Sequence, residues 1–229
     1  MTVSNSSDHV DRLARKVQEL AKHKPPSERV LIGVSGIPGS GKSTLGAAVA
    51  ARLNQLENTD SEFAVCLPMD GYHLSRAQLA AMPDPATAIH RRGAAFTFDA
   101  EAFYGLVQSL RGPLTPTSNI YAPSFDHAIK DPVADDIRIS PRSRVVILEG
   151  LYLSLDRKPW NLAAALLDES WFIDVDRGIA QARLVKRHVA SGIVPDIAAA
   201  EHRISSTDFL NADDIMQNRL PVQELLSGS

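Results

Sequence analysis

The chain lacks the cysteines, the long apolar runs and the excess of one charge that mark several classes of protein. Its 229 residues include one cysteine, Cys66, which cannot form an internal disulfide and lies in an apolar run typical of a buried structural thiol. No apolar run approaches the roughly 18 residues of a membrane-spanning helix. The net charge of −3, with both signs dispersed, argues against a general nucleic-acid binder and a polybasic membrane anchor.

The first residues also lack the pattern that is typical of a secretion signal. Residues 1–8 do not show a charged and then apolar pattern, so we expect a cytoplasmic location. Because 44% of the residues are hydrophobic, the chain can bury a full core, and its length predicts one domain over residues 1–229. Within residues 1–25, Val10, Leu13 and Val17 recur at helical spacing, which predicts an N-terminal helix packed on the domain.

The chain does contain a glycine-rich motif for binding phosphate. It is Gly36-Ile37-Pro38-Gly39-Ser40-Gly41-Lys42-Ser43-Thr44, which fits G-x-x-x-x-G-K-[ST]. In such a loop the backbone N–H groups surround a polyphosphate, the lysine lies near its β and γ phosphates, and the hydroxyl of Ser43 can hold Mg²⁺. An apolar run at 29–35 and a helical pattern after Thr44 supply the strand and helix that the motif requires. The sequence therefore predicts a nucleotide-binding protein in which Ser43 can hold Mg²⁺.

Further apolar runs predict an α/β fold of the P-loop NTPase type. Strands are expected at residues 29–35, 62–68, 144–148 and 170–175, with a short edge strand at 212–216. Helical patterns lie between them, so we expect a doubly wound parallel sheet of about five strands with helices on both faces. Residues 111–142 are rich in proline and contain the alternation Ile137-Arg138-Ile139, which predicts a substrate-side insertion with a small hairpin.

Two acidic residues follow predicted strands, at the edge where ligands bind in such sheets. Asp70 precedes Gly71 and could take the proton of a hydroxyl that attacks the γ-phosphate; the alternative is an aspartate that initiates a turn. Glu149 ends an apolar strand and is predicted to lie near Mg²⁺; the alternative is a capping carboxylate. Both acids therefore belong to the predicted site.

Two loops and a basic helix complete the predicted site. Residues 91–99 and 121–127 combine aromatic, acidic and basic side chains, as small-molecule pockets often do. Asp99 could also cap a helix that begins near Ala100. Arg183 and Arg187 are one turn apart in a predicted lid over residues 178–210, where closing arginines could be worth about 10³–10⁵ in rate; the alternative is a solvated basic face. His188 and His202 have no metal-ligand spacing, so no zinc site is expected.

From Val30 to Arg219 the order of these motifs resembles the phosphoribulokinase/uridine kinase family of P-loop kinases, which includes bacterial-type pantothenate kinases. The likeness rests on the phosphate-binding loop followed by four shorter motifs: Met69-Asp70-Gly71-Tyr72-His73, Phe98-Asp99, Pro123-Ser124-Phe125-Asp126 and Glu149-Gly150-Leu151. The chain is also similar to a branch of nucleoside- or sugar-kinase-like proteins that carry the motifs Met-Asp-Gly-Tyr/Phe-His-Leu and Arg-Arg-Gly.

The resemblance implies transfer of the γ-phosphate of ATP to a hydroxyl group. Asp70 matches the general base of the family, Glu149 the acid near the metal, and Asp99 the residue that holds ribose hydroxyls in uridine kinases. The candidate catalytic residues are therefore Asp70, Lys42, Arg183 and Arg187, and the candidate acceptor-binding residues are Tyr72, His73, Arg92, Asp99 and Phe125. Phe125 stands at a tyrosine position of uridine kinases, and His127 and Lys130 do not match their base-reading histidine. The acceptor stays open among nucleoside-, pantothenate- and sugar-like molecules.

The leading hypothesis is a small-molecule kinase with no nucleic-acid or membrane partner, and a homodimer is left open. The alternative is a regulatory P-loop NTPase that acts through a protein partner; it would hydrolyse ATP without stimulation by an acceptor. A nucleic-acid-processing ATPase would need a basic groove, which the mild acidity argues against. The basic pair Arg91 and Arg92 raises the further hypothesis of a phosphorylated or otherwise anionic acceptor.

Overall fold

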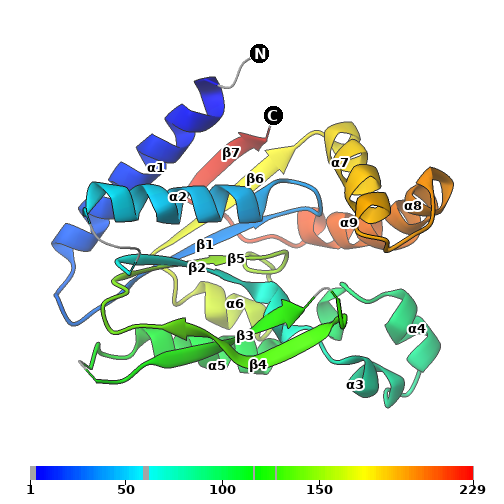
Figure 1. The fold of residues 1–229 in the computed structure, drawn as a ribbon, viewed down its shortest axis with the longest axis horizontal. Coiled ribbons are helices and arrows are strands. Elements are labelled where there is room, and N and C mark those ends of the chain that lie inside the picture. The colour runs from blue at the N-terminus through cyan, green and yellow to red at the C-terminus, as the bar shows by residue number, and fades with distance from the viewer. Residues whose placement is uncertain (1–3, 59–61, 116, 127, 229) are drawn as a thin grey trace.

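A parallel sheet forms the centre of the molecule (Figure 1). The computed structural model describes residues 4–58, 62–115, 117–126 and 128–228. Within these residues five strands pair in the order β2-β5-β1-β6-β7, and every neighbouring pair is parallel. Their bounds are β1 Val30–Gly36, β2 Ala64–Pro68, β5 Val145–Glu149, β6 Glu169–Val175 and β7 Glu224–Gly228. The predicted α/β class and parallel sheet are confirmed.

Side chains of the central strands alternate between two apolar layers. On β1, Val30 and Ile32 belong to one buried cluster, whereas Leu31 between them belongs to the other. All seven residues of β1 are buried, as expected for a strand covered on both faces. The long apolar run at this position therefore reflects burial on two sides rather than the alternation of a half-exposed strand.

Helices cover both faces of the sheet, above and below it in Figure 1. The first face packs against α1 (Ser4–His23) and α2 (Lys42–Leu56), and Leu13 and Val17 of α1 are fully buried there. The second face packs against α5 (Ala100–Arg111), α6 (Trp160–Ala164) and α9 (Phe209–Gln217). The predicted N-terminal helix is confirmed, and it ends before Pro25-Pro26, since proline disfavours continuation of a helix.

The predicted edge strand at residues 212–216 is wrong. These residues belong to α9, in which Ala212 and Ile215, three positions apart, are buried against the sheet. The edge strand is β7, which pairs with β6 from Trp171↔Glu224 to Val175↔Gly228 and buries Leu226. A window of five residues could not separate a helical from an extended pattern, because both place apolar residues close together.

The insertion forms a longer antiparallel ribbon than predicted. It consists of β3 (Ile120–Asp126) and β4 (Asp131–Ile139), which form a separate two-stranded sheet. Short helices η1 (Met69–Tyr72), α3 (Arg76–Ala80), α4 (Pro85–His90) and η2 (Ala95–Thr97) lie between β2 and α5. After β6 come α7 (Arg177–Ala190), α8 (Ile197–Arg203) and a π-helical turn, η3 (Ile204–Asp208). No helix in the described part of the chain is long and apolar enough to cross a membrane.

Candidate active site

Three strands of the sheet end at the same edge and carry the predicted chemical groups there. Glu149, the last residue of β5, is paired with Val34 of β1 and Pro68 of β2. The phosphate-binding loop leaves β1 directly after this pairing, and Asp70 lies two residues beyond Pro68. Because neighbouring parallel strands are about 4.7–4.9 Å apart, this register brings the loop, Asp70 and Glu149 into one region.

The loop turns tightly into α2 at Gly41, whose backbone has a conformation that glycine adopts more readily than other residues. Gly41 has φ 96° and ψ 17°, the left-handed conformation, and a side chain added there would meet nothing within 4 Å. The space in front of its backbone is therefore open, as a loop that receives a phosphate group requires. The buried Lys42 begins α2, and its Nζ donates to the carbonyl oxygen of Ile37 at 3.0 Å. Both features fit a polyphosphate ligand.

Lys42 is 8% exposed, and its charge is balanced by the two acids that the sequence placed in the site. Burial lowers the pKa of Lys42 to about 8, the carboxylates of Glu149 and Asp70 raise it, and the positive charge of Arg187 lowers it. These four groups therefore lie within electrostatic range of one another, at the end of the phosphate-binding loop.

Glu149 lies beside the first turn of α2. Its Oε1 accepts a hydrogen bond from the Ser43 hydroxyl at 2.9 Å, and the residue is 7% exposed. The pKa of Glu149 is raised, mainly by burial. The positive charge of Lys42 lowers this pKa, and the negative charge of Asp70 raises it. Among the described residues no group of three or more His, Cys, Asp and Glu side chains could hold a metal ion by itself. One hydroxyl and one carboxylate nevertheless match the few protein ligands that Mg²⁺ takes beside phosphate oxygens and water.

Asp70 lies in η1, a turn that packs closely against the ribbon. A Cβ atom on Gly71 would lie 2.0 Å from the carbonyl oxygen of Pro123 in β3, so glycine permits this contact. The carbonyl oxygen of Asp70 lies 2.8 Å from Nδ1 of His73, whereas its carboxylate makes no hydrogen bond to any described residue. The carboxylate thus retains its acceptor capacity next to Lys42.

The two predicted arginines both lie on α7, which packs against the loop. Nη1 of Arg183 donates to the carbonyl oxygen of Gly39 at 3.3 Å. Arg187, one turn further on, acts electrostatically on Lys42 and Glu149. A Cβ atom on Gly39 would meet the carbonyl oxygen of Ala180 at 2.7 Å, so α7 is packed against the loop itself.

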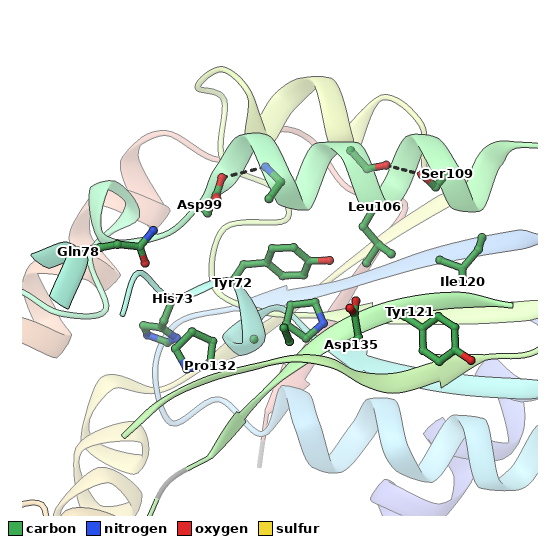
Figure 2. A pocket seen from close by; sticks show the side chains of 15 residues that line it. Tyr72, His73, Gln78, Asp99, Leu106, Ser109, Ile120, Tyr121, Pro132 and Asp135 are labelled. Atoms are coloured by element: carbon green, nitrogen blue, oxygen red, sulfur yellow. Dashed lines mark hydrogen bonds between the residues drawn. The ribbon is translucent and has the colours of Figure 1, made fainter. Parts of the chain in front are cut away.

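A cleft of about 480 Å³ begins at Gly71, the neighbour of Asp70, and extends between α5 and the ribbon (Figure 2). Tyr72, His73 and Asp99 line it, as predicted for acceptor binding. Asp99 also caps α5, since its Oδ1 accepts from the backbone N–H of Ala102 at 2.9 Å. The His73 ring packs on Phe98 with 4.0 Å between the ring centroids, which limits its freedom to rotate.

The other two candidate acceptor-binding residues, Arg92 and Phe125, are not among the residues that line this cleft. The Arg92 guanidinium donates to Asp131 Oδ1 at 3.0 Å and to the carbonyl oxygens of Lys130 and Leu74, and it lies over the Phe125 ring at 5.3 Å. These contacts join the ribbon to the segment that follows Asp70, so Arg92 positions the wall of the cleft. His127, the last residue of the predicted loop 121–127, falls outside the described residues.

Comparisons with known proteins show the family to which the chain belongs. The sequence profile of the phosphoribulokinase/uridine kinase family matches residues 31–192, well over half of the chain. The chain belongs to this family.

Individual relatives of this kinase cover most of its length. It is 76% identical over 162 residues to the ATP-dependent kinase-like protein notR' of Aspergillus versicolor, which covers 70% of this chain and 94% of that protein. It is 42% identical over 208 residues to a Schizosaccharomyces pombe protein whose name suggests a uridine kinase. That match covers 91% of this chain and 86% of the other protein. A crystal structure from Silicibacter sp. TM1040 is described as that of a candidate kinase of a fructose transport system, and it superposes with a TM-score of 0.82 at 34% identity. The superposition covers 94% of this chain and 98% of the other.

The kinase also has a second cleft, on the other side of the phosphate-binding loop, which the sequence did not predict. It has a volume of about 440 Å³ and lies between Thr44, Arg183, Ile173 and the end of β7. His9 and Val10 of α1 contribute to its wall. No local motif marks His9, Val10 and the end of β7, because they come from opposite ends of the chain and meet at this cleft only in the folded molecule.

Proposed function

We propose that this kinase transfers the γ-phosphate of MgATP to a hydroxyl of a small nucleoside-, pantothenate- or sugar-like molecule. One observation carries the proposal: Lys42, Asp70 and Glu149 act on one another at the end of the phosphate-binding loop, and an open cleft begins beside Asp70. Family membership supports the use of ATP.

Residues 36–44 are the proposed binding site for the triphosphate. The open space at Gly41 and the buried Lys42 support this assignment. The second cleft adjoins Ser40 and Thr44 and offers apolar walls from Leu45 and Ile173, so we assign the nucleoside end of ATP to it. Ser43 and Glu149 are the proposed contacts to Mg²⁺ or its waters.

Asp70 is the proposed general base. When bound, MgATP supplies the phosphoryl group, which leaves the β–γ bridging oxygen and bonds to the acceptor oxygen. A carboxylate without a hydrogen-bond partner among the described residues can orient the acceptor hydroxyl and take its proton. Lys42, Arg183 and Arg187 provide positive charge around the phosphate site and would offset the charge that develops during transfer.

The test of this function is Asp70→Asn, assayed with nucleosides, pantothenate, and free and phosphorylated sugars. We expect acceptor-dependent ATP consumption to fall about 10²–10⁴-fold, as for the loss of a general base. ATP binding, measured by calorimetry, should stay within a few-fold of the wild type. Lys42→Ala serves as the blank. An Asp70→Asn protein that turns over at the wild-type rate would remove Asp70 from the proposed role.

A further inference from the structure

The cleft beside Asp70 is lined by acidic side chains and, among the described residues, by no lysine or arginine. Its charged lining residues, within the described part of the chain, are Asp99 from the start of α5 and Asp135 from β4, and no lysine or arginine lines it. The remaining polar side chains carry hydroxyl, amide and imidazole groups. A ligand in this cleft therefore meets hydrogen-bond acceptors with negative charge and no permanent cation.

Tyr72 provides an independent sign of a ligand. It is 7% exposed, and its ring packs edge-to-face on Phe103, with 5.3 Å between centroids. Its hydroxyl has no hydrogen-bond partner among residues 4–58, 62–115, 117–126 and 128–228. Burial raises the pKa of Tyr72 above its ordinary value, and the negative charges of Asp99 and Asp135 add to this effect. The hydroxyl thus stays protonated within electrostatic range of two carboxylates, and it can bind a polar ligand.

Asp135 owes its position to an irregularity of the ribbon. Between the pairs Ala122↔Ile137 and Ser124↔Val133, β3 has one residue whereas β4 has three, residues 134–136. Such a bulge redirects a side chain. Asp135 has φ 53°, a left-handed conformation that aspartate and asparagine tolerate better than most residues. Figure 2 shows its carboxylate on the ribbon side of the cleft, near Tyr72.

The basic pair near the cleft does not offset these acids. Arg91 donates from Nη2 to Asn211 Oδ1 at 3.0 Å, and Arg92 is bound to Asp131. Neither arginine lines the cleft. The structure thus offers no support for the hypothesis that this pair recognises an anionic acceptor.

We infer that the acceptor is a neutral molecule with several hydroxyl groups, and that Asp135 selects it together with Tyr72 and Asp99. The two carboxylates can each accept hydrogen bonds from acceptor hydroxyls, and the Tyr72 hydroxyl can donate to another acceptor oxygen. A phosphate or carboxylate on the acceptor would be repelled by both acids. This inference rests on the proposed kinase function, and it narrows the substrate class of the same site.

The experiment measures phosphoryl transfer from MgATP to matched pairs of acceptors. The pairs are ribose, fructose and uridine, each with its phosphate monoester, and glycerol with glycerate. The proteins are the wild type, Asp135→Asn, Asp135→Lys and Asp136→Asn, the last being an exposed neighbour on β4 that does not line the cleft. Asparagine tolerates the left-handed conformation, so Asp135→Asn should fold normally.

We expect the wild type to favour the neutral member of each pair. Asp135→Asn should raise the KM of the best neutral acceptor about tenfold, as for the loss of a charged hydrogen bond, with the KM of ATP unchanged. Asp135→Lys should improve the phosphorylated members relative to the neutral ones, and Asp136→Asn should match the wild type.

Three results would overturn the inference. Preferred transfer to the anionic members would refute the neutral class while the kinase function stands. Equal behaviour of Asp135→Asn and Asp136→Asn would refute the role of Asp135. If no acceptor raised ATP consumption above the Lys42→Ala blank, the proposed kinase function would fail, and the inference with it.

Discussion

Lys42 and Glu149 are each less than a tenth exposed, and each compensates the charge of the other. Burial disfavours the charged form of both groups, so it lowers the pKa of Lys42 and raises that of Glu149. Each opposite charge works against that effect. A polyphosphate would add negative charge beside Lys42 and so favour its protonated form, which couples nucleotide binding to pH.

This coupling predicts that ATP affinity falls as pH rises above about 8, the pKa of Lys42 in the free protein. Below this pH the lysine is already a cation, so binding takes up no proton there. Above it, the lysine must regain a proton, and the Kd should rise by up to about tenfold per pH unit. Calorimetric titrations with ATP between pH 7 and 10 measure this slope.

Lys42→Arg is the matched control for the pH profile. Arginine keeps its charge over this range, so the variant should bind more weakly but with a flat profile. If its Kd rose with the same slope as that of the wild type, another group would be responsible.

At the scale of elements, the acceptor cleft depends on the contact between η1 and β3. Gly71 lies against the backbone of Pro123, and Arg92 ties the tip of the ribbon, through Asp131, to the segment after η1. The ribbon is a separate two-stranded sheet, and an isolated ribbon of this kind is marginally stable. These contacts therefore fix the wall that carries Asp135 relative to Asp70.

Gly71→Ala should disturb this contact, because the added Cβ would lie 2.0 Å from the Pro123 carbonyl oxygen. We expect a loss of about 1–3 kcal/mol in the free energy of unfolding, as for overpacking, together with a lower kcat/KM for the acceptor. Urea denaturation and steady-state kinetics measure the two effects.

Gly105→Ala is the control for stability. Gly105 lies within α5, where an added Cβ meets nothing within 4 Å, so alanine should stabilise the protein by about 0.5–1 kcal/mol. Equal free energies of unfolding for the two variants would contradict the proposed tight contact.

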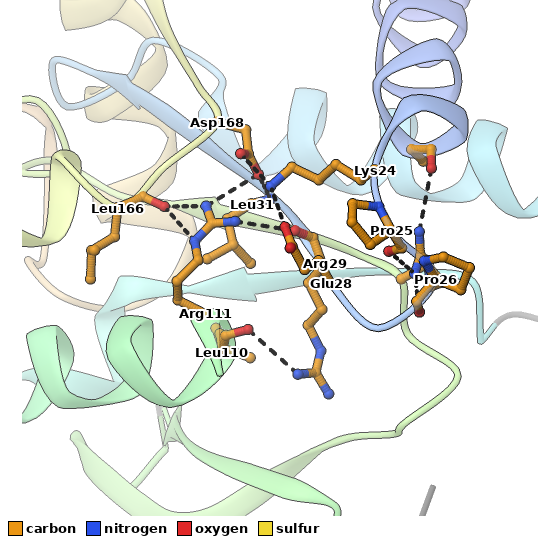
Figure 3. A network of polar contacts seen from close by, with 12 residues as sticks. Lys24, Pro25, Pro26, Glu28, Arg29, Leu31, Leu110, Arg111, Leu166 and Asp168 are labelled. Atoms are coloured by element: carbon orange, nitrogen blue, oxygen red, sulfur yellow. Dashed lines mark hydrogen bonds and ion pairs between the residues drawn. The ribbon is translucent and has the colours of Figure 1, made fainter. Parts of the chain in front are cut away.

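At the scale of the whole molecule, a polar network holds the opposite edge of the sheet (Figure 3). Asp168 Oδ2 accepts from the Leu31 backbone N–H at 2.8 Å and from Arg111 Nη2 at 3.1 Å, and its Oδ1 pairs with Lys24 Nζ at 2.7 Å. Arg111 also donates to the backbone of Arg29 and Leu166. One carboxylate thus joins the segment after α1, the strand β1 and the end of α5.

Asp168→Asn should therefore lower stability without changing catalysis. Asparagine removes the carboxylate that pairs with Arg111 and the closer of the two carboxylates that pair with Lys24. We expect a loss of about 1–3 kcal/mol in the free energy of unfolding. The kcat/KM should stay at the wild-type value, since the network lies at the edge of the sheet away from the phosphate-binding loop. Denaturation curves and kinetics on the same samples provide the measurement.

Glu28→Gln tests whether the loss of stability in Asp168→Asn depends on the burial of the carboxylate. Glu28 pairs with the same Lys24 at 3.7 Å, but its side chain is 47% exposed. Its loss should change the free energy of unfolding by no more than about 0.5 kcal/mol. A Glu28→Gln effect as large as that of Asp168→Asn would argue that net charge, not the partly buried network, is responsible.

The sequence by itself determined the nucleotide loop, four of the five strands and the acids at their ends. These features are local: the loop conformation depends on Gly41 and its neighbours, and a strand buried on both faces is apolar throughout, as β1 is. Because parallel strands end at one edge, the order of elements was enough to predict that Asp70 and Glu149 approach Lys42.

Only the tertiary structure decided which side chains line the clefts. Arg92 is a residue type that often contacts ligands, yet its guanidinium forms an ion pair with Asp131. This pairing depends on where the ribbon folds back. Asp135 reaches the acceptor cleft because of a bulge, and β7 reaches β6 across more than forty residues of chain. Such contacts join distant segments, and their energies depend on packing that no local pattern of residues encodes.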